Sequence, residues 1–78
     1  SYSVSIRVIG GEDAPILVCV SNVCTELGLM IVSVNGRIDA KNHQSIVEFT
    51  IKLGKKDDLD LLINKVNQNS CITDIFRI

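Results

Sequence analysis

The sequence predicts an α+β fold in which a four-stranded antiparallel sheet carries two helices on one face. Its 78 residues are enough for one domain, over residues 1–78. Apolar residues make up 46% of the chain, which is typical of a globular protein. The spacing of those residues changes between the two-residue and helical periods in the order βαββαβ. Because each β-α-β unit crosses over right-handedly, this order favours the ferredoxin-like sandwich with strand order 4-1-3-2.

A strand and a helix are expected first. Residues 2–9 read YSVSIRVI, in which apolar and polar side chains alternate, as in a half-buried strand. Residues 15–27 have apolar positions at helical spacing, followed by Gly28, which predicts a helix that ends at this glycine. Asp13 is expected to cap the helix and Pro15 to lie in its first turn.

A hairpin is expected next. Residues 29–38 are rich in β-branched side chains and predict a second strand. The polar residues 39–43 form a turn into residues 44–53, where apolar and polar positions alternate. On that third strand, Phe49 is expected to point into the core.

A second helix and a last strand close the pattern. Asp57 is the expected N-cap of a helix that ends near Gln68. Residues 71–78, CITDIFRI, predict the final strand. Its inward face stays open at this stage, because Asp74 interrupts one alternation and Phe76 interrupts the other.

Charge and hydropathy argue against several classes of function. The net charge of −1 gives no electrostatic footprint for nucleic acid or an anionic membrane. The longest apolar run, residues 16–20, is far shorter than the roughly 20 residues of a membrane span. No basic leader with a cleavage site opens the chain. We therefore expect a cytoplasmic module of a longer protein that does not enter membranes.

The residue types that usually carry chemistry do not assemble into a site. Cys19, Cys24 and Cys71 are odd in number and lack paired spacing, so free thiols are expected. On a helix, Cys19 and Cys24 point about 140° apart and cannot share a metal. His43 lies in a polar turn without a local partner and is expected to be exposed. GGEDAP at residues 10–15 matches no phosphate-binding motif. The sequence therefore predicts no catalytic residue, metal or cofactor.

Charged residues gather where the second helix begins. The acidic side chains there suit a helix N-terminus and indicate capping rather than a metal site. Lys52, Lys55 and Lys56 form a basic corner that could contact a phosphate backbone. A solvated helix entry is the favoured alternative. The open face of the two central strands is expected to carry no aromatic platform for RNA bases.

The more informative feature is apolar surface on a predicted edge strand. Leu29, Met30, Ile31 and Val32 make the second strand apolar on both faces, and natural proteins seldom leave such an edge open. Val18 also falls among polar positions of the first helix. We predict an association surface formed by the second strand and the first helix, and a homodimer that uses it.

Four segments together resemble an ACT domain. They are YSVSIRV, then DAPIL opening the first helix, then VNGRID ending the second strand, then LINKVNQNSCITDIFRI. The chain is most similar to the C-terminal ACT module of the Rel/Spo-type bifunctional GTP pyrophosphokinases, which make and degrade (p)ppGpp. The turn Arg37-x-Asp39 and the closing segment with Arg77 are its most specific parts.

The resemblance implies a regulatory role. ACT domains pair side by side and hold an amino acid between the first loop of one copy and the second strand of its neighbour. In the Rel/Spo group, the C-terminal half responds to ribosomes and uncharged tRNA and relays starvation to the catalytic domains. The resemblance thus implies an allosteric, non-catalytic module, with ribosome or tRNA contact as a family expectation.

The first loop departs from the family pattern. The family has D-R-x-G-L-L, whereas here Asp13 is followed by Ala14, Pro15, Ile16 and Leu17. Ala14 stands where the family has arginine. The family's glycine has no counterpart here, because this segment is one residue shorter. Ile16 is expected to crowd the space that the glycine leaves for a ligand, so this loop is expected to serve as a turn.

Three functions therefore stay open. The leading interpretation is a regulatory ACT domain of a (p)ppGpp synthetase/hydrolase that transmits a signal through its association surface. The second is an amino-acid sensor on a metabolic enzyme, with Asp13, Ile16, Leu17 and Ile31 lining the pocket. The third is a plain dimerisation module.

Overall fold

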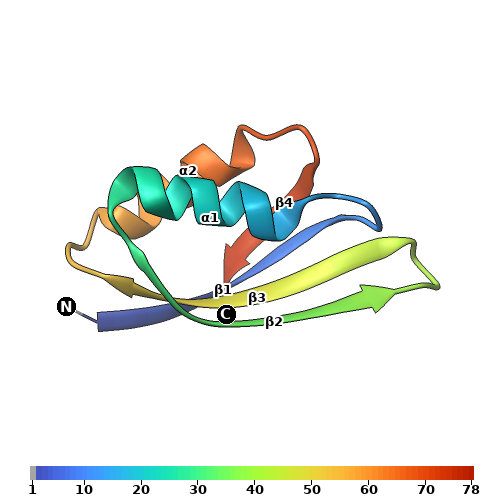
Figure 1. Cartoon of the computed structure of the whole chain (residues 1–78), viewed down its shortest axis with the longest axis horizontal. Helices are drawn as coiled ribbons and strands as arrows, with labels where there is room; N and C mark the ends of the chain where they lie inside the picture. Colours follow the sequence, from blue (N-terminus) through green and yellow to red (C-terminus); the bar gives the residue numbers. More distant parts are fainter. Residues whose placement is uncertain (1) are drawn as a thin grey trace.

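A computed structural model describes residues 2–78 and contains the six expected elements in the expected order (Figure 1). They are β1 (Tyr2–Gly11), α1 (Ile16–Leu27), β2 (Met30–Asp39), β3 (Gln44–Leu53), α2 (Asp58–Asn67) and β4 (Ile72–Arg77). Every element lies within two residues of its predicted bounds.

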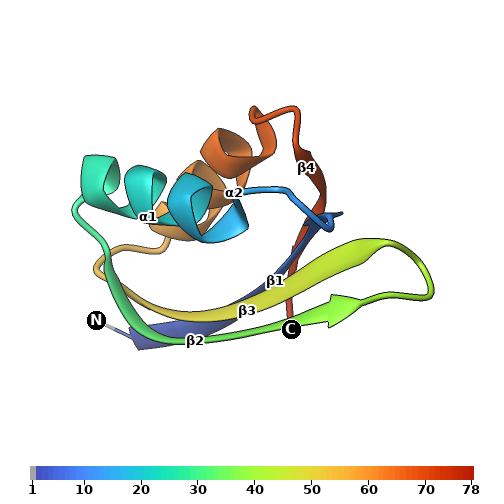
Figure 2. The same ribbon diagram turned by 45° about the vertical axis from the view of Figure 1, so that its right-hand side comes forward.

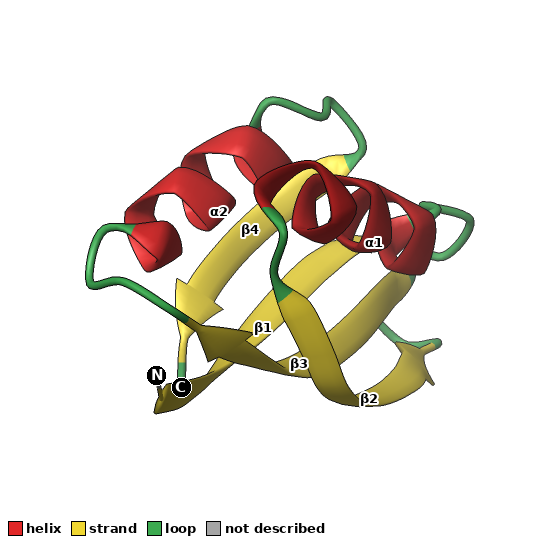
Figure 3. Cartoon of the chain, turned by 60° about the vertical axis from the view of Figure 1, so that its left-hand side comes forward, coloured by secondary structure: helices red, strands yellow, loops and turns green. Residues whose placement is uncertain are grey.

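The four strands form one antiparallel sheet in the order β2-β3-β1-β4 (Figure 3). This confirms the predicted order 4-1-3-2, which is the same order counted from the opposite margin of the sheet. β1 and β3 are paired along their whole length, from Tyr2 opposite Leu53 to Gly11 opposite Gln44. β2 and β4 are the two margins of the sheet.

Both helices cover the same face of the sheet, and the core lies between the two layers (Figures 1 and 3). The helices supply the residues at their predicted apolar positions, and the strands supply alternate residues. The largest fully buried side chain is that of Phe49, as predicted. The members of the core are Val4, Ile6, Val8, Ile16, Val20, Val23, Cys24, Phe49, Ile51, Leu53, Leu62, Val66, Ile72 and Ile75.

The first helix ends as its sequence predicts but begins differently. Gly28 adopts the left-handed conformation with φ 70°, and the N–H of Leu29 donates to the carbonyl of Cys24 at 2.8 Å. At the other end the N-cap is Pro15, and no side chain caps the helix. The prediction that Asp13 caps α1 was therefore wrong. Asp13 lies two residues before the N-cap, outside the position from which a side chain reaches the first free N–H groups.

The second helix has the predicted N-cap residue but a different acidic contact. Asp57 is the N-cap, yet its side chain makes no capping hydrogen bond. The Oδ2 of Asp58 instead accepts from the N–H groups of Gly54 and Lys55, at 3.1 and 2.9 Å. This carboxylate organises the turn that leads from β3 into α2.

A bulge settles which face of the last strand is buried. Ile72 pairs with Gly10 and Asp74 pairs with Ile9, so the register shifts by one residue at Thr73. Because of this extra residue, Ile72 and Ile75 both point into the core, each 8% exposed. A strict two-residue alternation cannot place both on one face, which is why the sequence left the register open.

The hairpin of β2 and β3 extends beyond the helices (Figures 1 and 2). Each strand has 10 residues, and extended chain rises about 3.3 Å per residue. α1 has 12 residues but rises only about 1.5 Å per residue. The helix is therefore little more than half as long as the strands, and the hairpin tip has no helix over it.

We expect Gly10→Ala to lower the free energy of unfolding by about 1–3 kcal/mol. A Cβ on Gly10 would lie 2.8 Å from the Cβ of Ala14 and 2.8 Å from the carbonyl oxygen of Cys71. Urea unfolding of the chain measures the change. Gly11→Ala is the matched control, because a Cβ there meets nothing within 4 Å. Equal effects of the two substitutions would show that Gly10 is not a required close contact.

Candidate functional site

The margin strand β2 has the apolar exposure that the sequence predicts. Met30 is 63% exposed and Val32 is 55% exposed. Leu29 and Ile31 pack partly against the core. The register between β2 and β3 shifts between Ile31 and Ser33, so Val32 lies in a bulge without a partner on β3.

The apolar surface continues along β2 farther than expected. Val34 and Ile38 pair with Phe49 and Ser45 of β3, on the side of the sheet that faces the helices, yet they are 44% and 57% exposed. Ile38 is exposed because α1 does not reach the hairpin tip, whereas Val34 lies within the length of the helix but on the margin strand of the sheet. Neither residue was predicted to be part of the apolar edge, although the short helix and the long strand together indicate that Ile38 lies beyond α1.

Two apolar side chains of α1 are exposed. Leu17 is 53% exposed and Val18 is 58% exposed. The other flank of α1 faces α2, since Glu26 accepts a hydrogen bond from Nζ of Lys65 on α2 at 2.9 Å. At 100° per residue, Leu17 lies about 180° around the helix from Glu26, on the flank toward β2. Val18 lies a further 100° around the helix, on the side of α1 away from the sheet. We use the name β2–α1 surface for Leu17, Met30, Val32, Val34 and Ile38.

A shallow hollow of about 360 Å³ lies beside the β1–α1 loop. Its lining comprises Gly11, Asp13, Ala14, Pro15 and Cys71. Of the four residues predicted to line an amino-acid pocket, Asp13 alone lies here. Ile16 is a core residue with 2% exposure, because it is the first apolar residue of α1 to face the sheet.

A second, larger hollow of about 470 Å³ lies at the other end of the sheet. Residues 27–30 form one side, and Lys52, Lys55 and Asp58 are among the residues on the other. Two of the three lysines of the predicted basic corner thus face one hollow. Lys56 is exposed and lies outside its lining.

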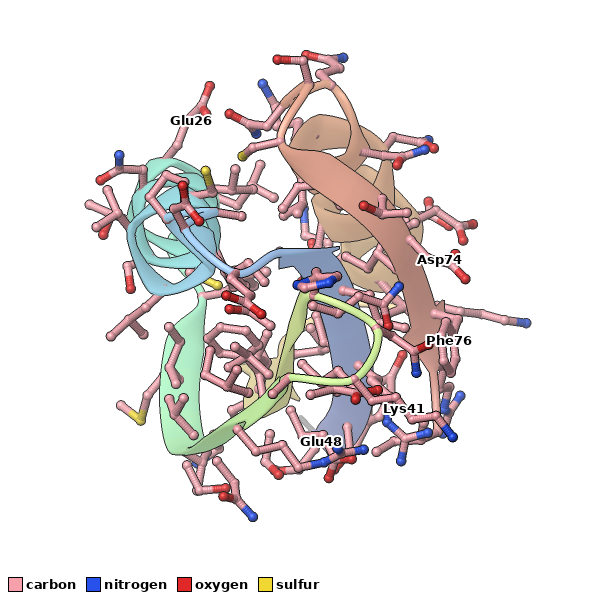
Figure 4. The ribbon with its side chains drawn as sticks, turned by 90° about the vertical axis from the view of Figure 1, so that its right-hand side faces the viewer. Glu26, Lys41, Glu48, Asp74 and Phe76 are labelled. Atoms are coloured by element: carbon pink, nitrogen blue, oxygen red, sulfur yellow. The ribbon has the colours of Figure 1, made fainter. Side chains whose placement is uncertain are left out.

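The open face of the sheet carries a cross-strand polar row. The guanidinium of Arg7 donates from Nε to Oε2 of Glu48 at 2.8 Å, and its Cζ lies 5.8 Å from the ring centroid of Phe76. Figure 4 shows Glu48 and Phe76 on the side of the sheet away from the helices. The direction of Phe76 could not be predicted from the alternation of residues, because the bulge in β4 sets it.

The tip of the β2–β3 hairpin is held by side chains. Nδ2 of Asn42 donates to Asp39 at 2.8 Å, and this hydrogen bond keeps the pKa of the exposed Asp39 carboxyl below its ordinary value. His43 has an 85% exposed side chain, as predicted, and its Nδ1 lies 3.3 Å from Oε1 of Glu12. The tip is therefore placed beside the β1–α1 loop.

The cysteines are free thiols, as expected. Cys24 is buried, and burial raises the pKa of its thiol. Within residues 2–78, His, Cys, Asp and Glu side chains form no group of three or more that could hold a metal ion. Over the same residues, neither helix has the length and apolarity that a membrane crossing requires.

A family model of the ACT domain matches residues 1–77. The chain is an ACT domain. This regulatory family has the ferredoxin-like fold seen here. No curated protein sequence matches the chain significantly.

Solved ACT structures share the fold at low sequence identity. The ACT domain from GTP pyrophosphokinase of Chlorobium tepidum superposes with a TM-score of 0.78 at 17% identity, covering 99% of this chain and 97% of that one. An ACT domain protein from Streptococcus pneumoniae has a TM-score of 0.73 at 22% identity, covering 96% and 88%. A homoserine dehydrogenase from Thiobacillus denitrificans gives 0.78 at 10% identity, but the matched region is only 16% of that enzyme. Similar ACT folds thus occur in proteins of different activity.

Proposed function

We propose that this ACT domain regulates a (p)ppGpp synthetase/hydrolase, and that it transmits its signal by pairing with a second copy through the β2–α1 surface. The pairing favours one arrangement of the parent enzyme over another, which shifts the balance of its states. The chain itself contributes contact surfaces, and the chemistry belongs to the parent. Contact with the ribosome or with tRNA is a further expectation from the family resemblance.

The observation that carries this proposal is the apolar exposure of one sheet margin. Met30, Val32, Val34 and Ile38 lie on a single edge strand. Unpaired backbone groups and exposed apolar side chains on an edge together favour association with another surface. The other margin, β4, is shorter, with 6 residues, and it carries Thr73 and Asp74.

The choice of parent is supported by the superposition on the Chlorobium tepidum domain. The superposition covers 99% of this chain and 97% of the Chlorobium tepidum domain, so neither chain has a large insertion relative to the other. The sequence motifs that resemble the Rel/Spo group support the same parent. Because identity is only 17%, the parent is our proposal rather than a consequence of the fold.

The coding sequence upstream of Ser1 tests the parent. We expect it to encode hydrolase and synthetase domains of the (p)ppGpp enzymes. Sequencing the gene, or measuring (p)ppGpp synthesis by the complete protein, checks this expectation. An upstream dehydrogenase or hydroxylase would replace this parent with an enzyme of amino-acid metabolism.

Sedimentation equilibrium tests the pairing. We expect the chain to form dimers, and Leu17→Lys combined with Val34→Lys to shift it to monomers, since a charged side chain at each position must be desolvated in the interface. Leu61→Lys is the matched control, because Leu61 is a 47% exposed apolar residue on α2, outside the β2–α1 surface. A wild-type chain that stays monomeric at millimolar concentration would contradict the pairing, as would equal weakening by the control.

A second candidate function is the binding of an amino acid between two copies. β1 and β2 run parallel to each other, because both pair antiparallel with β3. The hollow at the end of β1 and the hollow at the start of β2 therefore lie at opposite ends of the sheet. In a side-by-side pair related by a two-fold axis, β2 of one copy runs opposite to β2 of the other. Such a pair would bring the β1–α1 loop of one copy, residues 12–15, to the same end of the joined sheets as the hollow beside Met30 of its partner.

Calorimetric titration with leucine, isoleucine, valine and serine tests this second function. If the loop of one copy and β2 of its partner bind an amino acid together, we expect saturable binding at sub-millimolar concentration. Asp13→Asn should then weaken it by about 10- to 150-fold, since a carboxylate that accepts from the ligand ammonium contributes roughly 1.5–3 kcal/mol. Asp74→Asn, on the other margin, is the control. Heats that do not saturate would contradict amino-acid binding, and association would remain as the function of the domain.

A further inference from the structure

Two cysteines from distant parts of the sequence meet on the flank of the domain away from β2. Sγ of Cys19, in the first turn of α1, lies 3.7 Å from Sγ of Cys71, which precedes β4, although the two residues are 52 positions apart. Both are partly exposed. We propose that Cys19 and Cys71 form a redox-active dithiol site, which low-molecular-weight disulfides oxidise to an intramolecular disulfide.

The backbone around this pair holds the two thiols in place. Gly10 approaches the carbonyl oxygen of Cys71 so closely that a Cβ would lie 2.8 Å from it. The turn before β4 is closed by hydrogen bonds from the N–H of Asn69 to Val66 and from the N–H of Ile72 to Asn69, both at 3.0 Å. Cys19 is fixed by the helix. The short distance therefore belongs to two ordered segments, and little movement is needed to form the bond.

The surroundings favour redox chemistry over metal binding at this pair. Since no group of three His, Cys, Asp or Glu side chains forms within residues 2–78, the two thiols lack the further ligands of a tetrahedral zinc site. The third cysteine, Cys24, is 2% exposed in the core and is shielded from solution.

The two thiols differ in access, which sets the order of reaction. Cys71 lines the hollow beside the β1–α1 loop, where a small disulfide can approach it. Burial raises the pKa of the Cys19 thiol, and the neighbouring Cys71 adds to this effect. Because Cys71 lines this hollow and Cys19 does not, Cys71 is the thiol that a small disulfide reaches first.

The reaction is a two-step thiol–disulfide exchange. Cys71, after losing its proton, attacks one sulfur of the small disulfide, forms a mixed disulfide and releases the first small thiol. Cys19 then loses its proton and attacks Sγ of Cys71, which forms the Cys19–Cys71 bond and releases the second small thiol. One small disulfide is reduced to two thiols, and two protein thiols are oxidised to one disulfide.

The bond would connect the first turn of α1 to the start of β4. The β1–α1 loop lies between these two segments, and Pro15 and Asp13 share the hollow with Cys71. Oxidation would therefore restrict the loop that the second candidate function places next to the partner's β2. The dithiol chemistry itself depends on neither the pairing nor the amino acid, so its test is independent of both.

Incubation of the chain with a series of reduced and oxidised glutathione mixtures, followed by alkylation and mass spectrometry, tests the proposal. We expect the wild-type chain to lose two alkylatable thiols and the mass of two hydrogen atoms. Peptide mapping should join Cys19 to Cys71 and find Cys24 alkylated. The melting temperature of the oxidised chain should rise by roughly 10 °C, because the closed loop restricts the unfolded chain.

Single substitutions separate the steps. Cys19→Ala should leave Cys71 carrying one glutathione, and Cys24→Ala should still form the disulfide. Three wild-type thiols that stay alkylatable in fully oxidised glutathione would overturn the proposal. A wild-type chain that accumulates only a glutathione adduct at Cys71, or only disulfides between chains, would overturn it as well.

Discussion

Ten consecutive antiparallel pairs join β1 to β3, and the other features of the domain depend on this central ladder. Because β1 and β3 are paired on both sides, they are buried in the middle of the sheet and their inward residues form most of the strand contribution to the core. β2 and β4 are left as margins. The same ladder brings Gly10 and Gly11 to the end of the sheet where the first loop, the hairpin tip and Cys71 meet.

The two margins are unlike, and the difference follows from their bulges. The shift at Thr73 turns Ile72 and Ile75 both inward, so β4 buries these two side chains in the core and leaves Thr73 and Asp74 exposed. The shift at Val32 has the opposite result on β2, because it adds an apolar residue that faces no partner strand. One extra residue thus removes apolar surface from one edge and adds it to the other.

Sequence periodicity was sufficient for the elements and their order, and for Phe49 as a core residue. It failed where one residue changes a register or a direction. The inward face of β4 depends on the bulge at Thr73, and the cap of α1 depends on where Pro15 enters the helix. The apolar edge was found at residues 29–32 because four apolar residues are adjacent there. Ile38 was missed because its exposure comes from the unequal lengths of helix and strand, and Val34 was missed because it stands between polar residues of a margin strand. The Cys19–Cys71 proximity joins segments that no local pattern relates.

The geometry separates the surfaces of the domain. Leu17 and β2 lie on one flank of α1, whereas Cys19 and Glu26 lie on the other, against Cys71 and Lys65. A contact on the β2 side and a bond on the β4 side would therefore not compete for space. They would meet only at the β1–α1 loop, whose Glu12 carbonyl accepts from Ser45 of β3 at 3.0 Å and whose Asp13 to Pro15 segment borders Cys71. If the domain integrates two signals, this loop is the physical element through which one could change the other.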